Sequence, residues 1–389
     1  MSLLEASIRI GQRVAPNRIV NQPMEGNDAD EQGNPTELTL ERYRKLAEGG
    51  AGVIFVEALT ISRESRARKN QLVIHSKTAG GLGNLIREMR RINSASLILM
   101  QITHSGSQSQ GGFSFPILTE EEIVAIEDAF ARAAVIAEEV GADGIDFKQC
   151  HGYLGGELLR PANLRPDLFG GSFETRTRFF RETAQKIKDA VSDSFLLGSR
   201  FSAYEGIPGG FGTGGAEEVI EDLTEPLALA GAVEKAGFHY VNVTAGIPPV
   251  TPEIVRPTRS YPEGVYRHFG WAKAVKKAVK IPVIGSGYSY LRDGQNELKE
   301  ADPVKKSFTY WADRNLRERN CDLVGLGRQS FADPLFAQKI LSGEAWKINF
   351  CLACGGCSAL LRAQAPTGCV VYFDFYKNLF RKLRSAAPG

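Results

Sequence analysis

Three features of other protein classes are missing from the sequence. No stretch approaches about eighteen consecutive apolar residues, so we expect no membrane span. The formal net charge is only +2 in 389 residues, which gives no reason to expect nucleic acid or an anionic membrane as a partner. The N-terminal segment MSLLEASIRIGQRVAPNRIV has no basic region followed by an apolar run. We therefore predict a cytoplasmic protein without a signal peptide.

Cysteine is scarce, and its distribution is uneven. The six cysteines are too few for a disulfide framework in a chain of this length. Four of them, Cys351, Cys354, Cys357 and Cys369, have the spacing C-x2-C-x2-C-x11-C. Three thiolates in a tight loop and a distant fourth suit the four corners of a 4Fe-4S cluster. Tetrahedral zinc, which usually takes two C-x2-C pairs, and reactive or structural thiols are the alternatives.

The composition, with 43% hydrophobic and 24% charged residues, is that of a globular protein with one large domain. Within residues 1–345, eight apolar, β-branched segments alternate with amphipathic helical segments. They are residues 18–24, 51–59, 96–104, 143–150, 195–202, 239–246, 281–287 and 321–328. Eight such units predict an α/β fold, a closed (β/α)8 TIM barrel, with a doubly wound open sheet as the alternative. Residues 346–389 form a short cysteine-rich C-terminal extension.

Two connections between the predicted strands are long enough to carry function. Residues 104–122 have the Gly, Ser and Gln content of an active-site loop. Proline in residues 246–266 disfavours a helix there. We expect this second segment to form a lid or a wall of the substrate site.

Polar side chains gather where the predicted strands end. Chemistry in a TIM barrel takes place at these C-terminal strand ends, so the residues are expected to face one site. They include Glu25, Glu57, Gln101, His104, Lys148, His151, Tyr153, Arg200, Asn242, Thr244 and Arg328. After the last two strands, the segments GSG and LGRQSFADP leave bare backbone N–H groups beside an arginine and a helix start. Such turns can bind the phosphate of a substrate or of a cofactor.

Several of these segments resemble the Old Yellow Enzyme family of FMN-dependent NADH:flavin oxidoreductases. They are NRIVNQPMEG, VEALTISRESR, MQITHSG, GSRFS, DLVGLGRQSFADP and, most specifically, HGYLGGELLRPANLRPDLFGGSFETRTRF. The resemblance extends from about residue 8 to residue 345. It implies an ene-reductase in which reduced FMN transfers hydride to an activated C=C bond of an unsaturated carbonyl or carboxyl compound. NAD(P)H is the electron donor that it implies.

The resemblance also implies which residues hold the flavin. Carried over position by position, they are Pro23, Met24, Glu25, Ala58, Gln101, Arg200, Gly285, Gly287, Gly327 and Arg328. Gln101 would hydrogen-bond the pyrimidine edge of the ring, and the three glycines with Arg328 would hold the phosphate. Arg200 would lie beside N1, where a fixed positive charge stabilises the anionic reduced flavin.

The catalytic residues that the resemblance implies are Lys148, His151 and Tyr153. In the family, two donors anchor the substrate carbonyl, hydride reaches the β-carbon, and a tyrosine protonates the α-carbon. Lys148 stands where a histidine or a neutral residue is usual. It would stabilise an enolate, accept an anionic group, or extend its amine into water. Glu25 replaces a small hydroxyl or thiol residue, and it would lower the flavin potential unless it is protonated or paired with Lys148. Cys150 is a redox-active thiol or a packed small residue.

The cysteine run resembles the iron–sulfur branch of the family, which includes 2,4-dienoyl-CoA reductase, 2-enoate reductase and trimethylamine dehydrogenase. There the cluster relays electrons between FMN and a C-terminal nucleotide-binding portion, and no GxGxxG unit follows the cysteines here. An electron-transfer protein is therefore a candidate partner, and a homo-oligomer is compatible with the sequence. The alternatives are an amine or C–H dehydrogenase that passes electrons outward, a flavin redox subunit of a larger complex, and a phosphate-binding barrel without flavin.

Overall fold

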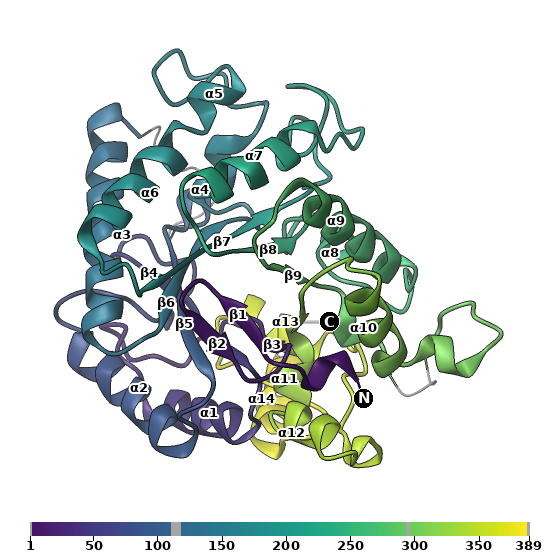
Figure 1. Cartoon of the computed structure of the whole chain (residues 1–389). Helices are drawn as coiled ribbons and strands as arrows, with labels where there is room; N and C mark the ends of the chain where they lie inside the picture. The colour runs from purple at the N-terminus through teal and green to yellow at the C-terminus, as the bar shows by residue number, and fades with distance from the viewer. Residues whose placement is uncertain (1, 110–117, 293–295, 387–389) are drawn as a thin grey trace.

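Parallel strand pairing closes the chain into a barrel. The computed structural model describes residues 2–109, 118–292 and 296–386, and Figure 1 shows the strands surrounded by helices. Within these residues, eight parallel strands pair in the order β10-β3-β4-β5-β6-β7-β8-β9, and β9 pairs with β10. They are β3 Ile19–Asn21, β4 Val53–Thr60, β5 Leu97–Thr103, β6 Gly144–Gln149, β7 Leu196–Ser202, β8 Tyr240–Thr244, β9 Val283–Gly285 and β10 Leu323–Leu326. The predicted TIM barrel is confirmed, and the open-sheet alternative is wrong.

Helices form the outer layer of the barrel. The helices that lead from one strand to the next are α1 Glu37–Glu48, α2 Ala79–Ile92, α3 Glu120–Glu139, α6 Arg178–Ala190, α7 Thr224–Lys235, α9 Gly264–Ala278 and α10 Phe308–Arg317, and α12 Phe336–Leu341 follows the last strand. In α2, Leu82, Leu85, Ile86 and Met89 are buried, which is the spacing of a single helix face packed on the sheet. Shorter helices α4 Leu154–Leu159, α5 Phe173–Arg176, α8 Pro252–Val255 and α11 Arg328–Ala332 lie in the connections.

A small apolar core fills the barrel interior. The strands contribute Val20, Val53, Phe55, Leu97, Leu99, Leu196, Tyr240, Ile284 and Leu323. Ile10 and Ala15 complete this core from an antiparallel hairpin, β1 Ile8–Ile10 and β2 Arg13–Ala15, that precedes the first barrel strand. The hairpin closes the N-terminal end of the barrel, so a site can form only at the opposite end, where the strands terminate in polar residues.

The structure of the two long connections can be compared with the predictions made from the sequence. In residues 246–266 the prediction of a non-helical segment is wrong at α8, because Pro252 occupies the first helical turn. Proline is tolerated there, since that N–H has no partner within a helix in any case. In residues 104–122, Gly106–Gln108 form a 3-10 turn, and residues 110–117 lie outside the described residues.

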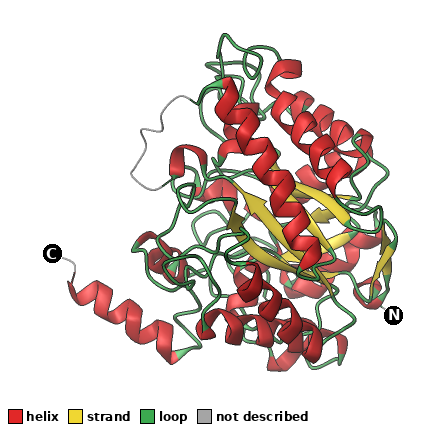
Figure 2. Cartoon of the chain, turned by 90° about the vertical axis from the view of Figure 1, so that its left-hand side faces the viewer, coloured by secondary structure: helices red, strands yellow, loops and turns green. Residues whose placement is uncertain are grey.

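The cysteine-rich extension packs on the barrel. Ile348 is buried in the main core, and Phe350 and Ala353 pack against that core. The extension contains α13 (Gly356–Arg362) and α14 (Asp374–Ala386), and α14 buries none of its residues. Figure 2 shows this last helix projecting away from the barrel. None of the helices in the described part of the chain is long and apolar enough to cross a lipid bilayer.

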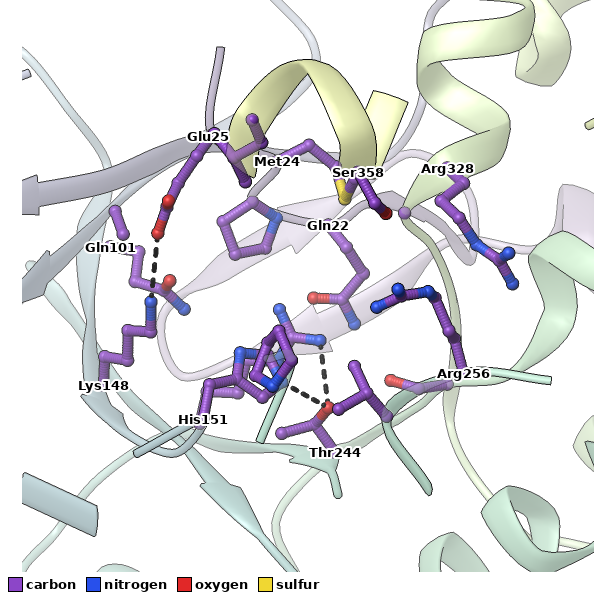
Figure 3. A pocket seen from close by; sticks show the side chains of 18 of the residues that line it. Gln22, Met24, Glu25, Gln101, Lys148, His151, Thr244, Arg256, Arg328 and Ser358 are labelled. Carbon is purple, nitrogen blue, oxygen red and sulfur yellow. Dashed lines mark hydrogen bonds and ion pairs between the residues drawn. The ribbon is translucent and has the colours of Figure 1, made fainter. Parts of the chain in front are cut away.

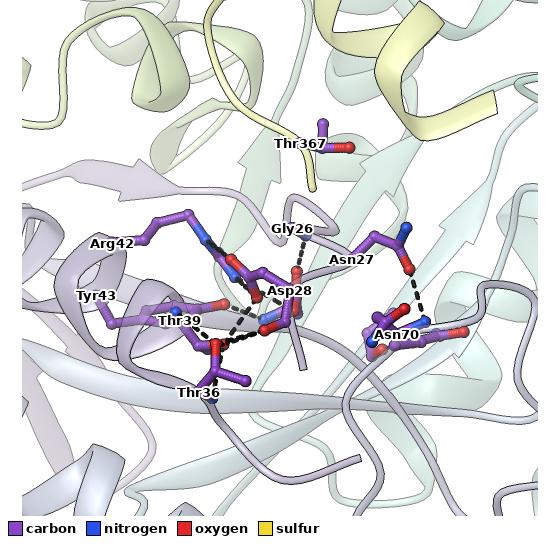
Figure 4. Close-up of polar contacts among 12 residues, drawn as sticks. Gly26, Asn27, Asp28, Thr36, Thr39, Arg42, Tyr43, Asn70 and Thr367 are labelled. Atoms are coloured by element: carbon purple, nitrogen blue, oxygen red, sulfur yellow. Dashed lines mark hydrogen bonds and ion pairs between the residues drawn. The ribbon is translucent and has the colours of Figure 1, made fainter. Parts of the chain in front are cut away.

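A buried polar network fixes the loop that follows β3 (Figure 4). Arg42 of α1 donates two hydrogen bonds to Asp28, each 3.0 Å long, and a further one of 3.3 Å to Glu57. Glu57 also accepts a hydrogen bond from the backbone N–H of Gly26. From the other side, the N–H of Thr367 in the extension donates to the carbonyl of Gly26 at 2.7 Å. The loop is therefore held between the barrel and the extension.

Candidate active site

A large cavity opens at the C-terminal ends of the strands. It encloses about 1290 Å³ of empty space, counted to its open mouth. The structure brings twelve of the thirteen predicted flavin-binding and catalytic residues into its lining. They are Pro23, Met24, Glu25, Ala58, Gln101, Lys148, His151, Tyr153, Arg200, Gly287, Gly327 and Arg328.

Gly285 is the predicted residue that the structure places elsewhere. It is the last residue of β9, and a Cβ built on it would lie 3.3 Å from Cys321 and 3.5 Å from Ala272. Gly285 therefore faces the helix layer. The next residue, Ser286, lines the cavity instead. Gly287 has a φ of +96°, and an added Cβ would lie 2.8 Å from His268, so this turn requires glycine.

Several lining residues were not predicted from the sequence. They are Gln22, Arg68, Gln108, Thr244, Pro248, Pro249, Val255, Arg256, Pro257, Ser286, Ser289, Gly325, Ser358, Leu361 and Arg362. Thr244 was expected only as a polar strand end, and five of these residues come from the proline-rich segment 246–266. This segment therefore forms part of the cavity wall, which agrees with the expectation of a lid or a wall at the substrate site. No sequence signal pointed to Arg68, or to the three residues from α13 in the extension.

The floor of the cavity is closed by a reciprocal amide pair. Gln22 donates to Asn242 at 2.8 Å, and Asn242 donates back to Gln22 at 2.8 Å. Both side chains are buried, at 4% and 0% exposure, so the pair satisfies two amides that would be costly to leave without partners. A rigid floor keeps whatever binds above it at the level of the strand ends.

Arg200 brings a buried positive charge to this level. It is 8% exposed, its terminal nitrogen lies 3.4 Å from the Thr244 hydroxyl, and its Nε has no hydrogen-bond partner among the described residues. No carboxylate in that part of the chain forms an ion pair with it. A buried guanidinium of this kind calls for an anionic partner. The negative N1–C2 side of a reduced flavin would be such a partner, so the residues present fit this group.

Asp146 lies behind the predicted flavin contact Gln101. The Gln101 side-chain amide donates to Asp146 at 2.6 Å, which fixes the orientation of the glutamine. Asp146 is fully buried, and burial raises its pKa from 3.8 to about 7, although the hydrogen bond from Gln101 and the charge of Arg200 oppose this. Below about pH 7 the group is therefore mainly neutral, and it leaves the charge of Arg200 uncompensated.

Glu25 and Lys148 form an ion pair, which was one of the two possibilities that the sequence left undecided for Glu25 (Figure 3). Lys148 Nζ lies 3.5 Å from Glu25 Oε1, and Tyr153 donates its hydroxyl to the same oxygen at 2.7 Å. Arg68 approaches the other oxygen of Glu25 at 3.7 Å. Lys148 Nζ also lies 3.4 Å from the centre of the Tyr153 ring. The Lys148 side chain is 4% exposed, so the alternative in which its amine extends into water is wrong.

The charges in this cluster determine its protonation. Burial disfavours ionised Glu25, but Lys148, Arg68 and the Tyr153 hydrogen bond outweigh burial and hold its pKa below the ordinary value. Burial lowers the pKa of Lys148, and the Glu25 carboxylate opposes that effect. Burial and then the charge of Glu25 raise the pKa of Tyr153 well above its usual range. The cluster therefore contains a carboxylate and a phenol that keeps its proton.

His151 is held as a neutral donor or acceptor. Burial, followed by the charges of Arg200 and Lys148, lowers its pKa well below the ordinary value. Its Nε2 lies 3.1 Å from the Thr244 hydroxyl, which fixes the ring (Figure 3). His151 has a φ of +63°, a conformation uncommon outside glycine that is often found at functional sites.

Cys150, between these residues, behaves as a packed side chain. It is 0% exposed. Burial raises the pKa of its thiol to about 11, so the reactive thiolate is scarce at neutral pH. The structure supports the packed alternative over the redox-active one.

The four clustered cysteines line a second, small cavity together. Ala353 and Gly355 have φ values of +51° and +76°, so the backbone curls around this cavity. Arg328 lines both this cavity and the large one. Within the described ranges, no three His, Cys, Asp or Glu side chains converge closely enough to hold a single metal ion. The prediction of an iron–sulfur cluster is not confirmed. Four thiols around one cavity are nevertheless a suitable set of ligands for such a cluster.

The arginine without an ion-pair partner among the described residues, the glycine turns after the last two strands and the buried tyrosine suit a barrel oxidoreductase that binds a flavin. The chain is a member of the NADH:flavin oxidoreductase / NADH oxidase family, whose model matches residues 4–346. FMN and NAD(P)H are thus supported as cofactors by the family.

Individual relatives agree with this assignment. The chain is 32% identical over 376 residues to the NADH oxidase of Thermoanaerobacter brockii, covering 90% of this chain and 52% of that protein. It is 32% identical over 344 residues to the NADPH dehydrogenase of Clostridium acetobutylicum, covering 82% of this chain and 89% of that protein. The solved complex of 2-naphthoyl-CoA reductase with 2-naphthoyl-CoA shares the fold, with a TM-score of 0.80 and 22% identity, over 97% of this chain and 58% of that one. The chain spans about half the length of the NADH oxidase.

Replacing Asp146 with asparagine is expected to change how stability depends on pH. The folded-state pKa of about 7 lies above the ordinary 3.8, so the folded chain binds this proton more tightly than the unfolded chain. The resulting stabilisation is complete below about pH 4 and is lost as the pH rises through about 7. Relative to the wild type, Asp146→Asn should therefore gain on the order of 1 kcal/mol of unfolding free energy per pH unit between pH 5 and 7.

Urea unfolding of the flavin-free chain at pH 5, 6 and 7 measures this difference. Asp193→Asn, at an exposed position, is the control and should run parallel to the wild type. Parallel curves for Asp146→Asn and the wild type would show that Asp146 does not hold its proton in the folded state.

Proposed function

We propose that the protein reduces an activated C=C bond of an unsaturated carbonyl or carboxyl compound, with NAD(P)H as the source of electrons. FMN, when bound, supplies the hydride. One observation carries the proposal: Lys148, His151 and Tyr153 line the same cavity as Arg200 and Gln101. Donors for a carbonyl oxygen, a proton for carbon and a cation for the flavin are thus present in one space.

His151 and Lys148 would bind the carbonyl oxygen of the substrate. Negative charge develops on that oxygen as hydride reaches the β-carbon, and fixed donors stabilise it because they need no reorganisation. His151 is held by Thr244, and Lys148 is held by Glu25. Lys148 is largely removed from water and His151 is partly buried, which strengthens their effect on a developing charge.

Tyr153 would give its proton to the α-carbon, which completes the two-electron reduction as hydride plus proton. Its raised pKa means that the proton is present at neutral pH. The tyrosinate left behind would lie under the Lys148 ammonium, 3.4 Å from the ring centre, with Arg68 lining the same cavity. Glu25 holds the phenol in place before the transfer, and Lys148 balances the charge of Glu25. This account supports Glu25 as a positioning residue.

Replacing Tyr153 with phenylalanine should slow substrate reduction selectively. A positioned general acid contributes roughly 10²- to 10⁴-fold to the rate, so reoxidation of the reduced enzyme by 2-cyclohexen-1-one or cinnamate should fall by at least roughly 10²-fold. Reduction of the enzyme by NADH or NADPH does not use this proton and should stay within about twofold. Stopped-flow absorbance at the flavin band measures both half-reactions.

Tyr310→Phe on the outer helix α10 is the matched control and should leave both half-reactions unchanged. Unchanged reoxidation in Tyr153→Phe would assign the proton to another group. If neither unsaturated compound reoxidises the wild type, while dimethylamine reduces it in the presence of a one-electron acceptor, the amine dehydrogenase alternative replaces the proposal.

We also propose that Cys351, Cys354, Cys357 and Cys369 bind a 4Fe-4S cluster that exchanges electrons with the flavin. Their common cavity and the curled backbone between them support this role. The cysteine spacing, with three residues in a tight loop and a distant fourth, also favours a cubane over the two C-x2-C pairs that are usual at tetrahedral zinc.

Iron and acid-labile sulfide analysis of anaerobically prepared protein tests this second proposal. About four irons and four sulfides per chain are expected. Cys369→Ser should lose most of them, whereas Cys321→Ser, which changes a buried cysteine of the barrel, should keep them. One zinc per chain in the wild type, or full iron content in Cys369→Ser, would contradict it.

A further inference from the structure

Three arginines gather at one end of the large cavity. Arg256 comes from the segment after β8, Arg328 begins α11, and Arg362 ends α13 in the C-terminal extension. All three line the cavity. Figure 3 shows Arg256 and Arg328 close together, on the side opposite Lys148. Of the three, the sequence pointed only to Arg328.

These arginines form no ion pair with a carboxylate in the described part of the chain. Arg328 donates a hydrogen bond to the backbone carbonyl of Pro257 at 2.9 Å. Burial, followed by the charge of Arg328, lowers the pKa of Arg256, and the charge of Arg362 acts in the same direction. The Cys357 thiol and then Glu253 oppose this effect, so Cys357 and Glu253 are the acidic groups within electrostatic reach of Arg256. Three repelling guanidiniums around one space favour the binding of an anion.

We infer that Arg256, Arg328 and Arg362 together bind the dianionic phosphate of FMN, so that the cysteine-rich extension is itself part of the flavin site. The inference rests on the proposed flavin-dependent function. The phosphate group suits the three residues because guanidinium groups bind its oxygens through paired, charge-assisted hydrogen bonds. Gly287 and Gly327, in the turns after β9 and β10, line the same cavity. Because they have no side chains, they leave room for a phosphate to approach the backbone N–H groups.

The extension is held firmly enough for this role. Leu360 of α13 is 0% exposed, and a Cβ on Gly356 would lie 2.3 Å from Val370, so the helix packs closely on its neighbours. Just beyond α13, Gln364 accepts a hydrogen bond from the N–H of Lys69 at 2.9 Å. Ser358 and Leu361, from the same helix, also line the cavity. The helix that carries Arg362 is thus fixed on both the cysteine side and the barrel side.

Flavin binding by the apoprotein tests this inference. FMN and riboflavin differ only in the phosphate, and quenching of their fluorescence gives both dissociation constants. Arg362→Ala and Arg256→Ala should each raise the Kd for FMN by about 10- to 100-fold, the range of a lost hydrogen bond to a charged group. The Kd for riboflavin should change less than about twofold. Arg362→Lys, which keeps the charge but not the paired donors, should lie between Arg362→Ala and the wild type.

Arg384→Ala, in the exposed last turn of α14, is the control and should not change either constant. Equal weakening of FMN and riboflavin in both alanine variants would show a purely structural role and overturn the inference. So would unchanged FMN binding accompanied by a KM increase for NADPH but not for NADH, because the phosphate would then be that of the nicotinamide cofactor. A wild-type chain that binds neither flavin overturns the proposed function as well, whereas normal wild-type binding with unaffected variants overturns this inference alone.

Discussion

The buried guanidinium of Arg200 is the constraint on which the site depends. A charge that is 8% exposed and forms no ion pair with a carboxylate among the described residues is costly for the folded chain on its own. The neighbouring strand offers a carboxyl group at Asp146, but burial keeps that group mainly protonated below about pH 7. The positive charge of Arg200 at the strand ends is therefore left without a compensating negative charge below about pH 7. An anionic reduced cofactor would compensate this positive charge, and the stabilisation would be greatest in the redox state that donates hydride.

The remaining charges divide the cavity into two unlike ends. At one end, Lys148 and Arg68 surround Glu25, so that the local charge is partly cancelled and Tyr153 is oriented. At the other end, Arg256, Arg328 and Arg362 form no ion pair with a carboxylate of the described residues, although Cys357 and Glu253 lie within electrostatic reach of Arg256. This asymmetry would give a bound flavin one favourable direction, with its ring beside the proposed catalytic residues and its phosphate beside the extension. The barrel core and the closed hairpin beneath the cavity hold both ends in fixed positions.

Much of the fold followed from the sequence, because each buried parallel strand is a short apolar segment bounded by turns. The residues at the strand ends could also be predicted, since a TIM barrel gathers them at one face and the family motifs name them. Gly285 shows the limit of that reasoning: one position along a strand reverses the direction in which a residue faces. Arg68 and Arg362 could not be predicted, because they lie outside the strands and reach the cavity only through tertiary packing. The pairing of Glu25 with Lys148 joins residues 123 positions apart, and only the structure could choose it among the alternatives.

The reduction potential of FMN bound to Arg200→Met tests the central claim most directly. Methionine removes the charge and keeps an unbranched side chain in the same space. At saturating FMN, the two-electron potential should fall by at least roughly 30 mV relative to the wild type, the equivalent of about 1.4 kcal/mol lost from the reduced state. A variant that binds FMN with an unchanged or higher potential would contradict the role of Arg200 as the cation that stabilises the reduced flavin.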